Sequence, residues 1–178
     1  MPDLASYANK YANVAFERHD GVLEVRLHTK GGPLQWGALA TSVHAQLGEA
    51  FHDIGHDDEN RVIILTGTGD SFLESFAMDE IGMENGPSAG FWDRIYREGK
   101  DLLMNLLDIP VPVIGAVNGP ATIHAEIPVI SDIVIASENA LFPDLAHFPR
   151  GTVPDDGVHL WWTMVLGVNR ARYFLLTR

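Results

Sequence analysis

Two short apolar runs, each closed by turn-forming residues, constrain the fold more than any other feature of this sequence. Residues 61–66 read RVIILT before the turn Gly67-Thr68-Gly69-Asp70, and residues 111–117 read VPVIGAV before Asn118-Gly119-Pro120. Apolar runs of this length, rich in β-branched residues and bounded by glycine and proline, are typical of buried strands. Amphipathic stretches alternate with these runs, and the alternation predicts an α/β fold.

The spacing of apolar residues places the other elements. Alternating residues at 14–18 and 22–28 surround Asp20-Gly21 and predict a hairpin. Apolar residues recur at helical spacing over 38–54, and again from Phe91 to Leu107 before Pro110 ends the pattern. We also expect a short helix near Ile123, a strand at 132–136, helices through 161–176, and long loops at 71–90 and 151–157. No repeat or linker interrupts the series, so residues 1–178 are expected to form one domain.

Composition narrows the classes of ligand and the compartment. The net charge of −12 comes from 12 Lys and Arg against 24 Asp and Glu, which disfavours nucleic acid or an anionic membrane surface as partner. A small apolar or neutral ligand in an internal pocket fits better. With no cysteine, the chain has no disulfide, thiolate zinc site or cysteine nucleophile. The polar N-terminus and the absence of a membrane-length apolar run predict a soluble cytoplasmic protein.

Three segments in order carry a resemblance to a known family. They read RVIILTGTGDSF at 61–72, VPVIGAVNGPAT at 111–122 and SDIVIASENALFPD at 131–144, and GTVPDDG and LGVNRARYFLLT extend the match towards the C-terminus. Together they resemble the crotonase (enoyl-CoA hydratase/isomerase) superfamily. This resemblance implies a core superhelix of stacked ββα turns. It also implies an oxyanion hole made by backbone N–H groups of two loops.

The departures from that family point to one of its branches. CoA-using members have an Ala-Gly-Ala-Asp-like stretch where residues 73–79 read LESFAMD, and a glycine triplet where this chain has Ile123-His124-Ala125. Bulky residues at these places weaken the case for CoA. The segments IHAEIP (123–128) and HFPRGTVPDDG (147–157) instead resemble the 6-oxocamphor hydrolase-like β-diketone hydrolases. That similarity implies retro-Claisen cleavage of a cyclic β-diketone, with no cofactor and no metal.

Assembly is a further expectation from the resemblance. Family members continue as C-terminal helices that build a trimer and cover the pocket, whereas this sequence stops at Leu176-Thr177-Arg178, about where those helices begin. We therefore expect a truncated C-terminal helical region, uncovered apolar surface over residues 161–176, and a homotrimer when the helices are present.

His147 and Asp156 are the leading candidates for activating water. Hydrolysis of a carbon–carbon bond needs an attacking water and a departing carbanion, which a β-diketone stabilises as an enolate. Histidine suits the first task because its ordinary pKa, about 6.5, lies near working pH. The two residues are nine apart on a loop rich in proline and glycine. In the hypothesis, Asp156 orients one ring nitrogen while the other activates water. The alternative is a partly buried loop histidine and a turn-forming aspartate.

Five further residues are assigned to the site largely on the resemblance. His124, expected near a helix start, would stabilise an oxyanion. Glu126 occupies the position of an acid/base carboxylate of the hydratases, although a surface glutamate is equally compatible with the sequence. His44, Trp36 and Phe91 are candidate substrate-binding residues at the pocket, with structural or core roles as the alternative.

Two other functions stay open at this point. One is a CoA-thioester hydratase or isomerase that uses Glu126, and the other is a non-catalytic crotonase-like binding scaffold. His52 and His56 have a metal-like spacing on a helix, but an exposed polar helix end is the preferred interpretation, so no metal is predicted there.

Overall fold

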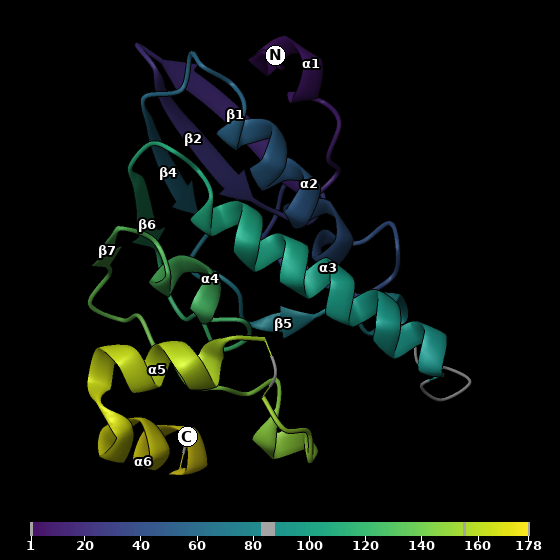
Figure 1. Cartoon of the computed structure of the whole chain (residues 1–178), viewed down its shortest axis with the longest axis vertical. Coiled ribbons are helices and arrows are strands. Elements are labelled where there is room, and N and C mark those ends of the chain that lie inside the picture. The colour runs from purple at the N-terminus through teal and green to yellow at the C-terminus, as the bar shows by residue number, and fades with distance from the viewer. Residues whose placement is uncertain (1, 83–87, 155, 178) are drawn as a thin grey trace.

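The computed structural model describes residues 2–82, 88–154 and 156–177, and its main sheet has five strands (Figure 1). Strands β1 (Val14–His19) and β2 (Val22–Leu27) form an antiparallel hairpin. Strands β4 (Val62–Thr66), β6 (Val113–Val117) and β7 (Ile133–Ala136) follow β2 in parallel, in that order. The predicted hairpin, the two predicted buried strands and the α/β class are confirmed.

Helices α2 (Val43–Gly55) and α3 (Ala89–Leu107) pack side by side, and their apolar faces join the same core as the central strands (Figure 1). Helix α2 begins later than the predicted residue 38. The N–H groups of Ala38 and Leu39 donate to the carbonyl of Glu80, and Ser42 is extended (φ −90°, ψ 174°). A contact with a distant segment therefore removes these residues from the helix, despite their helical spacing.

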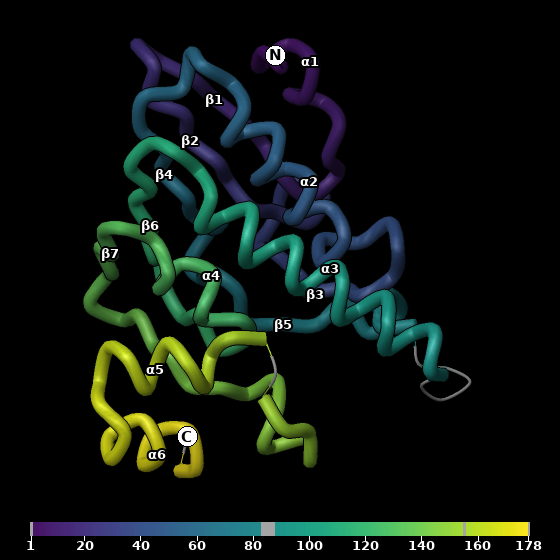
Figure 2. Tube along the Cα trace, in the orientation of Figure 1, coloured from purple at the N-terminus to yellow at the C-terminus, as the bar shows by residue number. Residues whose placement is uncertain are grey.

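Short elements complete the chain. They are α1 (Leu4–Tyr7), β3 (Gln35–Trp36), β5 (Ser75–Phe76), α4 (Glu126–Val129), α5 (Val158–Leu166), α6 (Val168–Thr177), and 3₁₀ helices at Met78–Glu80 and Phe148–Arg150. Strands β3 and β5 pair in parallel beside α3 (Figure 2). The predicted loop 71–90 thus contains a strand and a short helix, and its residues 83–87 lie outside the described residues.

The loops that follow β4 and β6 are locked together. The Asn118 side chain accepts from Gly67 N (3.1 Å) and donates to the carbonyls of Gly69 (2.7 Å) and Ser71 (3.0 Å). A Cβ atom at Gly119 would lie 1.9 Å from the carbonyl oxygen of Asp70, so only glycine fits this approach. This contact fixes the loop that leads to His124.

Apolar side chains remain uncovered on β7, α5 and α6. Ile135 is 61% exposed, Met164 63% and Leu176 66%. The expected apolar surface over residues 161–176 is therefore confirmed in this single chain. Within residues 2–82, 88–154 and 156–177, no helix combines the length and hydropathy needed to cross a membrane.

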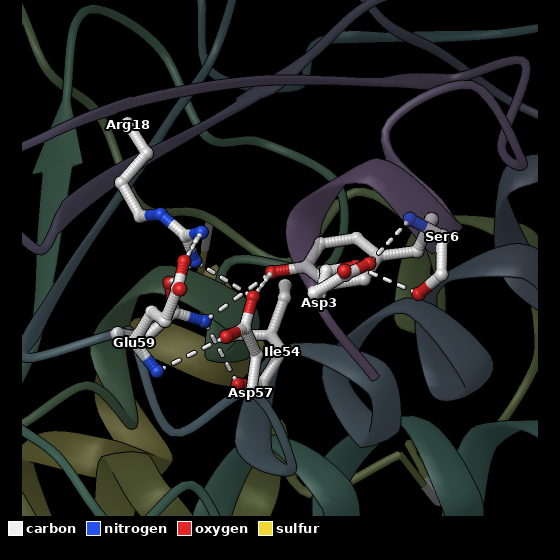
Figure 3. Close-up of polar contacts among 8 residues, drawn as sticks. Asp3, Ser6, Arg18, Ile54, Asp57 and Glu59 are labelled. Carbon is white, nitrogen blue, oxygen red and sulfur yellow. Dashed lines mark hydrogen bonds and ion pairs between the residues drawn. The ribbon is translucent and has the colours of Figure 1, made fainter. Parts of the chain in front are cut away.

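A buried polar cluster joins the N-terminal segment to the end of α2 (Figure 3). The Asp57 carboxylate accepts from the Tyr7 hydroxyl (2.7 Å) and from the Arg18 guanidinium (2.7 Å). We expect Asp57→Ala to lower the free energy of unfolding by about 1–3 kcal/mol, because buried donors lose their acceptor. Urea unfolding measures this, with the exposed neighbour Asp58→Ala as a control expected within about 0.5 kcal/mol of the wild type. Equal stability of the two variants would contradict the prediction.

Candidate active site

Two histidines from separate loops meet at one carboxylate. His124 lies between β6 and α4, His147 opens the 3₁₀ helix after β7, and Asp156 precedes α5. The Oδ2 atom of Asp156 is 2.8 Å from His124 Nδ1 and 3.2 Å from His147 Nε2. The two imidazole rings are 6.0 Å apart at 87°. The structure thus brings His147, Asp156 and His124 into one cluster, as the sequence predicted.

His124 is held as a buried cation. Its Nδ1 also lies 2.8 Å from Glu126 Oε1, and its ring stacks on Trp36 at 4.0 Å, tilted by 33°. Burial lowers the pKa of His124, but the charge of Glu126 and the contact with Asp156 outweigh burial and raise the pKa to about 10. A protonated imidazole over an indole face gains cation–π attraction. His124 therefore carries a positive charge at neutral pH.

The backbone at His124 explains where its side chain lies. Its φ of +50° is in the left-handed region, which a residue other than glycine adopts rarely and often at functional sites. Helix α4 starts only at Glu126 and has a single turn. His124 thus lies near the start of a short helix, as predicted, one residue before the N-cap Ala125. The positive φ of His124 is a further local feature that sets the direction of its imidazole ring.

Glu126 contacts His124 Nδ1 but is not among the residues that line the cavity described below. It is 2% exposed, and its Oε2 has no hydrogen-bond partner among the described residues. Burial, with the negative charge of Asp156 adding to it, raises the pKa of Glu126 to about 7. For Asp156, burial raises the pKa, but the contacts with His124 and His147 hold it far below its usual range. Asp156 is therefore an anion between two histidines.

His147 has a second carboxylate partner that the sequence interpretation missed. Its Nδ1 lies 2.9 Å from Asp144 Oδ1. Burial lowers the pKa of His147, but the contacts with Asp144 and Asp156 outweigh burial and raise the pKa to about 9. Asp144 had the appearance of a turn residue after Phe142-Pro143. The signal for it was an aspartate three residues before a histidine, a spacing at which the carboxylate can accept N–H groups of its own turn.

The cluster opens on a cavity of about 590 Å³. His124, His147 and Asp156 line it, together with the predicted Trp36, His44 and Phe91. Its other walls are mainly apolar and aromatic, including Phe76, Trp92, Leu103 and Leu160. A larger groove of about 790 Å³ runs between β7 and α5–α6, but its described lining contains no titratable side chain, so we place the candidate site in the smaller cavity.

His44 is buried at the edge of this cavity and paired with a carboxylate. Its Nδ1 lies 2.9 Å from Glu98 Oε2 on α3, and Glu98 is held in turn by Arg94 (2.9 Å). The Trp36 ring meets the His44 ring edge-on at 5.6 Å. Burial raises the pKa of Glu98, but His44 and Arg94 lower it overall. His44 is thus fixed between helices α2 and α3 beside the histidine cluster.

His124, Glu126 and Asp156 also have the grouping of metal ligands, since one donor atom from each lies within 4.8 Å of the others. The two N···O separations of 2.8 Å are, however, hydrogen-bond lengths that leave the donor atoms in direct contact. The arrangement is accounted for by one imidazolium between two carboxylates.

Comparison with known proteins agrees with this fold. The chain belongs to the enoyl-CoA hydratase/isomerase family, whose profile matches residues 17–178. A solved structure of a β-diketone hydrolase from the cyanobacterium Anabaena sp. PCC 7120, bound to (S)-3-oxocyclohexyl acetic acid, is similar at 46% identity and a TM-score of 0.88, over 96% of this chain and 67% of that one. The crotonase-like fold and the resemblance to a β-diketone hydrolase are therefore confirmed.

The curated relatives are named as CoA enzymes and not as β-diketone hydrolases. The 1,2-epoxyphenylacetyl-CoA isomerase of Escherichia coli (strain K12) is 31% identical over 85% of this chain and 56% of its own length. A probable peroxisomal enoyl-CoA hydratase of Arabidopsis thaliana is 29% identical over 82% of this chain and 52% of its own length. The chain thus spans about half the length of these curated relatives, and their names point to CoA thioesters.

Proposed function

We propose that this protein hydrolyses a carbon–carbon bond of a β-diketone, most readily a cyclic one, to give a keto acid. The observation that carries the proposal is the Asp156 carboxylate set between His124 and His147 on the wall of an apolar cavity. The similar β-diketone hydrolase structure, which holds a keto acid, supports the same chemistry.

The reaction assigns a role to each group in the cavity. The His147–Asp156 pair accepts a proton from water, which attacks one carbonyl carbon of the diketone. The oxyanion that forms is stabilised by the His124 imidazolium through Nε2, because Nδ1 is occupied by two carboxylates. The carbon–carbon bond then breaks, the enolate takes up the proton, and the products are a ketone and a carboxylic acid within one molecule.

This scheme revises one part of the sequence-based hypothesis. Asp156 was expected to orient His147 and to leave the other ring nitrogen for water. That other nitrogen, Nδ1, contacts the buried carboxylate of Asp144, whereas Asp156 meets Nε2. The contacts therefore favour proton transfer at the Nε2 end of the ring, beside the cavity.

A CoA-thioester hydratase or isomerase is the second candidate, favoured by the names of the curated relatives. In that reaction Glu126 would have to reach the substrate. Its 2% exposure and its place behind His124 fit a supporting role better. A non-catalytic binding scaffold is the third candidate, and it predicts binding without turnover.

A turnover screen separates the three candidates. Cyclic 1,3-diketones of increasing ring size are incubated with the protein, and the loss of diketone absorbance and the appearance of keto acid are followed. Crotonyl-CoA hydration is assayed in parallel. Keto acid without hydration supports the proposal. Hydration alone favours the second candidate, and diketone binding without either product favours the third.

Other parts of the proposal concern the whole assembly. We treat residues 1–178 as one crotonase-like unit that takes a small apolar diketone, uses no cofactor, and associates as a homotrimer. The uncovered apolar side chains of α5 and α6 support self-association.

The rate should depend on pH through His147. Its ring is surrounded by Asp144, Asp156 and the His124 cation, and its pKa is raised to about 9. A base must be unprotonated to accept a proton, so kcat/KM should fall below about pH 9. It should also fall above about pH 10, where His124 loses its charge. Profiles from pH 6 to 11 test this, and a limb at the ordinary histidine pKa of about 6.5 would contradict it.

A further inference from the structure

Two backbone N–H groups and a ring nitrogen of His147 converge on a single oxygen of Asp144. Its Oδ1 accepts from the backbone N–H of Ala146 (3.1 Å) and of His147 (3.2 Å), and it lies 2.9 Å from His147 Nδ1. The Asp144 side chain is 2% exposed and that of His147 is 9% exposed. The contact is therefore shielded from water, and the two backbone donors fix the position of the oxygen independently of the histidine ring.

We infer that Asp144 is the positioning residue of this site, holding neutral His147 in the tautomer with its proton on Nδ1, so that Nε2 is the basic atom. The inference rests on the proposed function for its catalytic meaning. A carboxylate anion only accepts hydrogen bonds, so the ring nitrogen that faces Asp144 must carry a hydrogen. A neutral imidazole has one N–H, and the lone pair is then on Nε2.

Asp156 is poorly suited to this orienting role. Its Oδ2 lies between two ring nitrogens, 2.8 Å from His124 Nδ1 and 3.2 Å from His147 Nε2. When His147 loses its proton, Asp156 stays paired with the His124 cation. The negative charge of Asp156 is then already compensated, so it does not require a hydrogen on His147 Nε2. Asp144 has no second cation among its described contacts, so it continues to accept a hydrogen bond from His147 Nδ1.

The tautomer of His147 can be measured directly. Protein with ¹⁵N-labelled histidine is studied by long-range ¹H–¹⁵N correlation at about pH 9.5, above the His147 pKa of about 9 and below the His124 pKa of about 10. The His147 signals are assigned by their loss in His147→Gln. The wild type should show a protonated Nδ1 and a bare Nε2. A neutral ring protonated on Nε2 in the wild type would overturn the inference.

Two substitutions separate positioning from simple structural support. Asp144→Asn keeps an oxygen that the same two backbone N–H groups hold towards the ring. It should preserve the tautomer while moving the acid limb of the rate profile to lower pH, because a negative charge is lost. Asp144→Ala removes the acceptor, so the proton should move to Nε2, where Asp156 accepts it. The kcat of Asp144→Ala should fall by about 10²–10⁴-fold, a decrease close to the one expected when the general base itself is removed.

The readouts keep the two proposals distinct. If no diketone is hydrolysed, the proposed function fails, but the tautomers of the wild type and of Asp144→Asn still test the role of Asp144. If diketones are hydrolysed while Asp144→Ala keeps the Nδ1–H tautomer and an unchanged acid limb, Asp144 is only structural and the inference fails. Should Asp144→Ala not fold, the wild-type tautomer and the shifted limb of Asp144→Asn decide the question.

Discussion

His147→Ala is expected to lower kcat for a cyclic β-diketone by about 10²–10⁴-fold, the usual contribution of a general base. The ring lies within ion-pair distance of both Asp144 and Asp156, so its loss removes the proton acceptor and leaves both carboxylates without this partner. Single-turnover measurement of keto acid formation gives the rate of the chemical step. Binding of the diketone should change less, because the apolar walls of the cavity are untouched.

The matched control is His159→Ala. His159 lines the same cavity, but it is exposed and has no ion pair within the described part of the chain. Its removal should leave kcat close to that of the wild type. Circular dichroism and thermal unfolding establish that both variants are folded. Near-full activity of folded His147→Ala, or equal losses in the two variants, would show that another group activates water.

The order of strands and helices could be predicted from the sequence because it depends on local patterns. The run RVIILT forms β4, and Asp20-Gly21 makes the turn of the β1–β2 hairpin, since both signals lie within a few residues. The start of α2 depends on something else. The carbonyl that holds Ala38 and Leu39 belongs to Glu80, far along the chain, and no periodicity reveals such a contact.

For the candidate site, too, some features could be predicted from the sequence and others could not. That His147, Asp156 and His124 meet was suggested by their positions on two loops together with the family resemblance, and the geometry agrees. The orientation of each ring was not predictable, because it depends on carboxylates whose positions follow from tertiary packing. Asp144 resembles an ordinary turn residue, and the pairing of His44 with Glu98 needs α2 and α3 to pack together. The left-handed backbone of His124 has no signature in the sequence.

His124→Ala is expected to affect both stability and rate. At neutral pH it removes the cation between two carboxylates, of which the Glu126 side chain is 2% exposed and that of Asp156 15%. Breaking a buried ion pair on one side costs about 3–5 kcal/mol, because a charge is left uncompensated. Loss of an oxyanion donor lowers kcat by about 10²–10³-fold. Urea unfolding at pH 7 and steady-state kinetics measure the two effects separately.

A double variant tests the physical cause. If the uncompensated Glu126 charge is responsible, His124→Ala with Glu126→Gln should be more stable than His124→Ala at about pH 9, above the Glu126 pKa of about 7, and should regain none of the lost rate. The pH dependence gives a second test. The pKa of His124 is raised from 6.5 to about 10 on folding, so its stabilising contribution is complete below about pH 6.5 and is lost as the pH rises through 10. The stability difference between the wild type and His124→Ala should therefore narrow over that range. A difference that stays constant to pH 10.5, together with no recovery in the double variant, would mean that packing against Trp36, rather than charge, holds His124 in place.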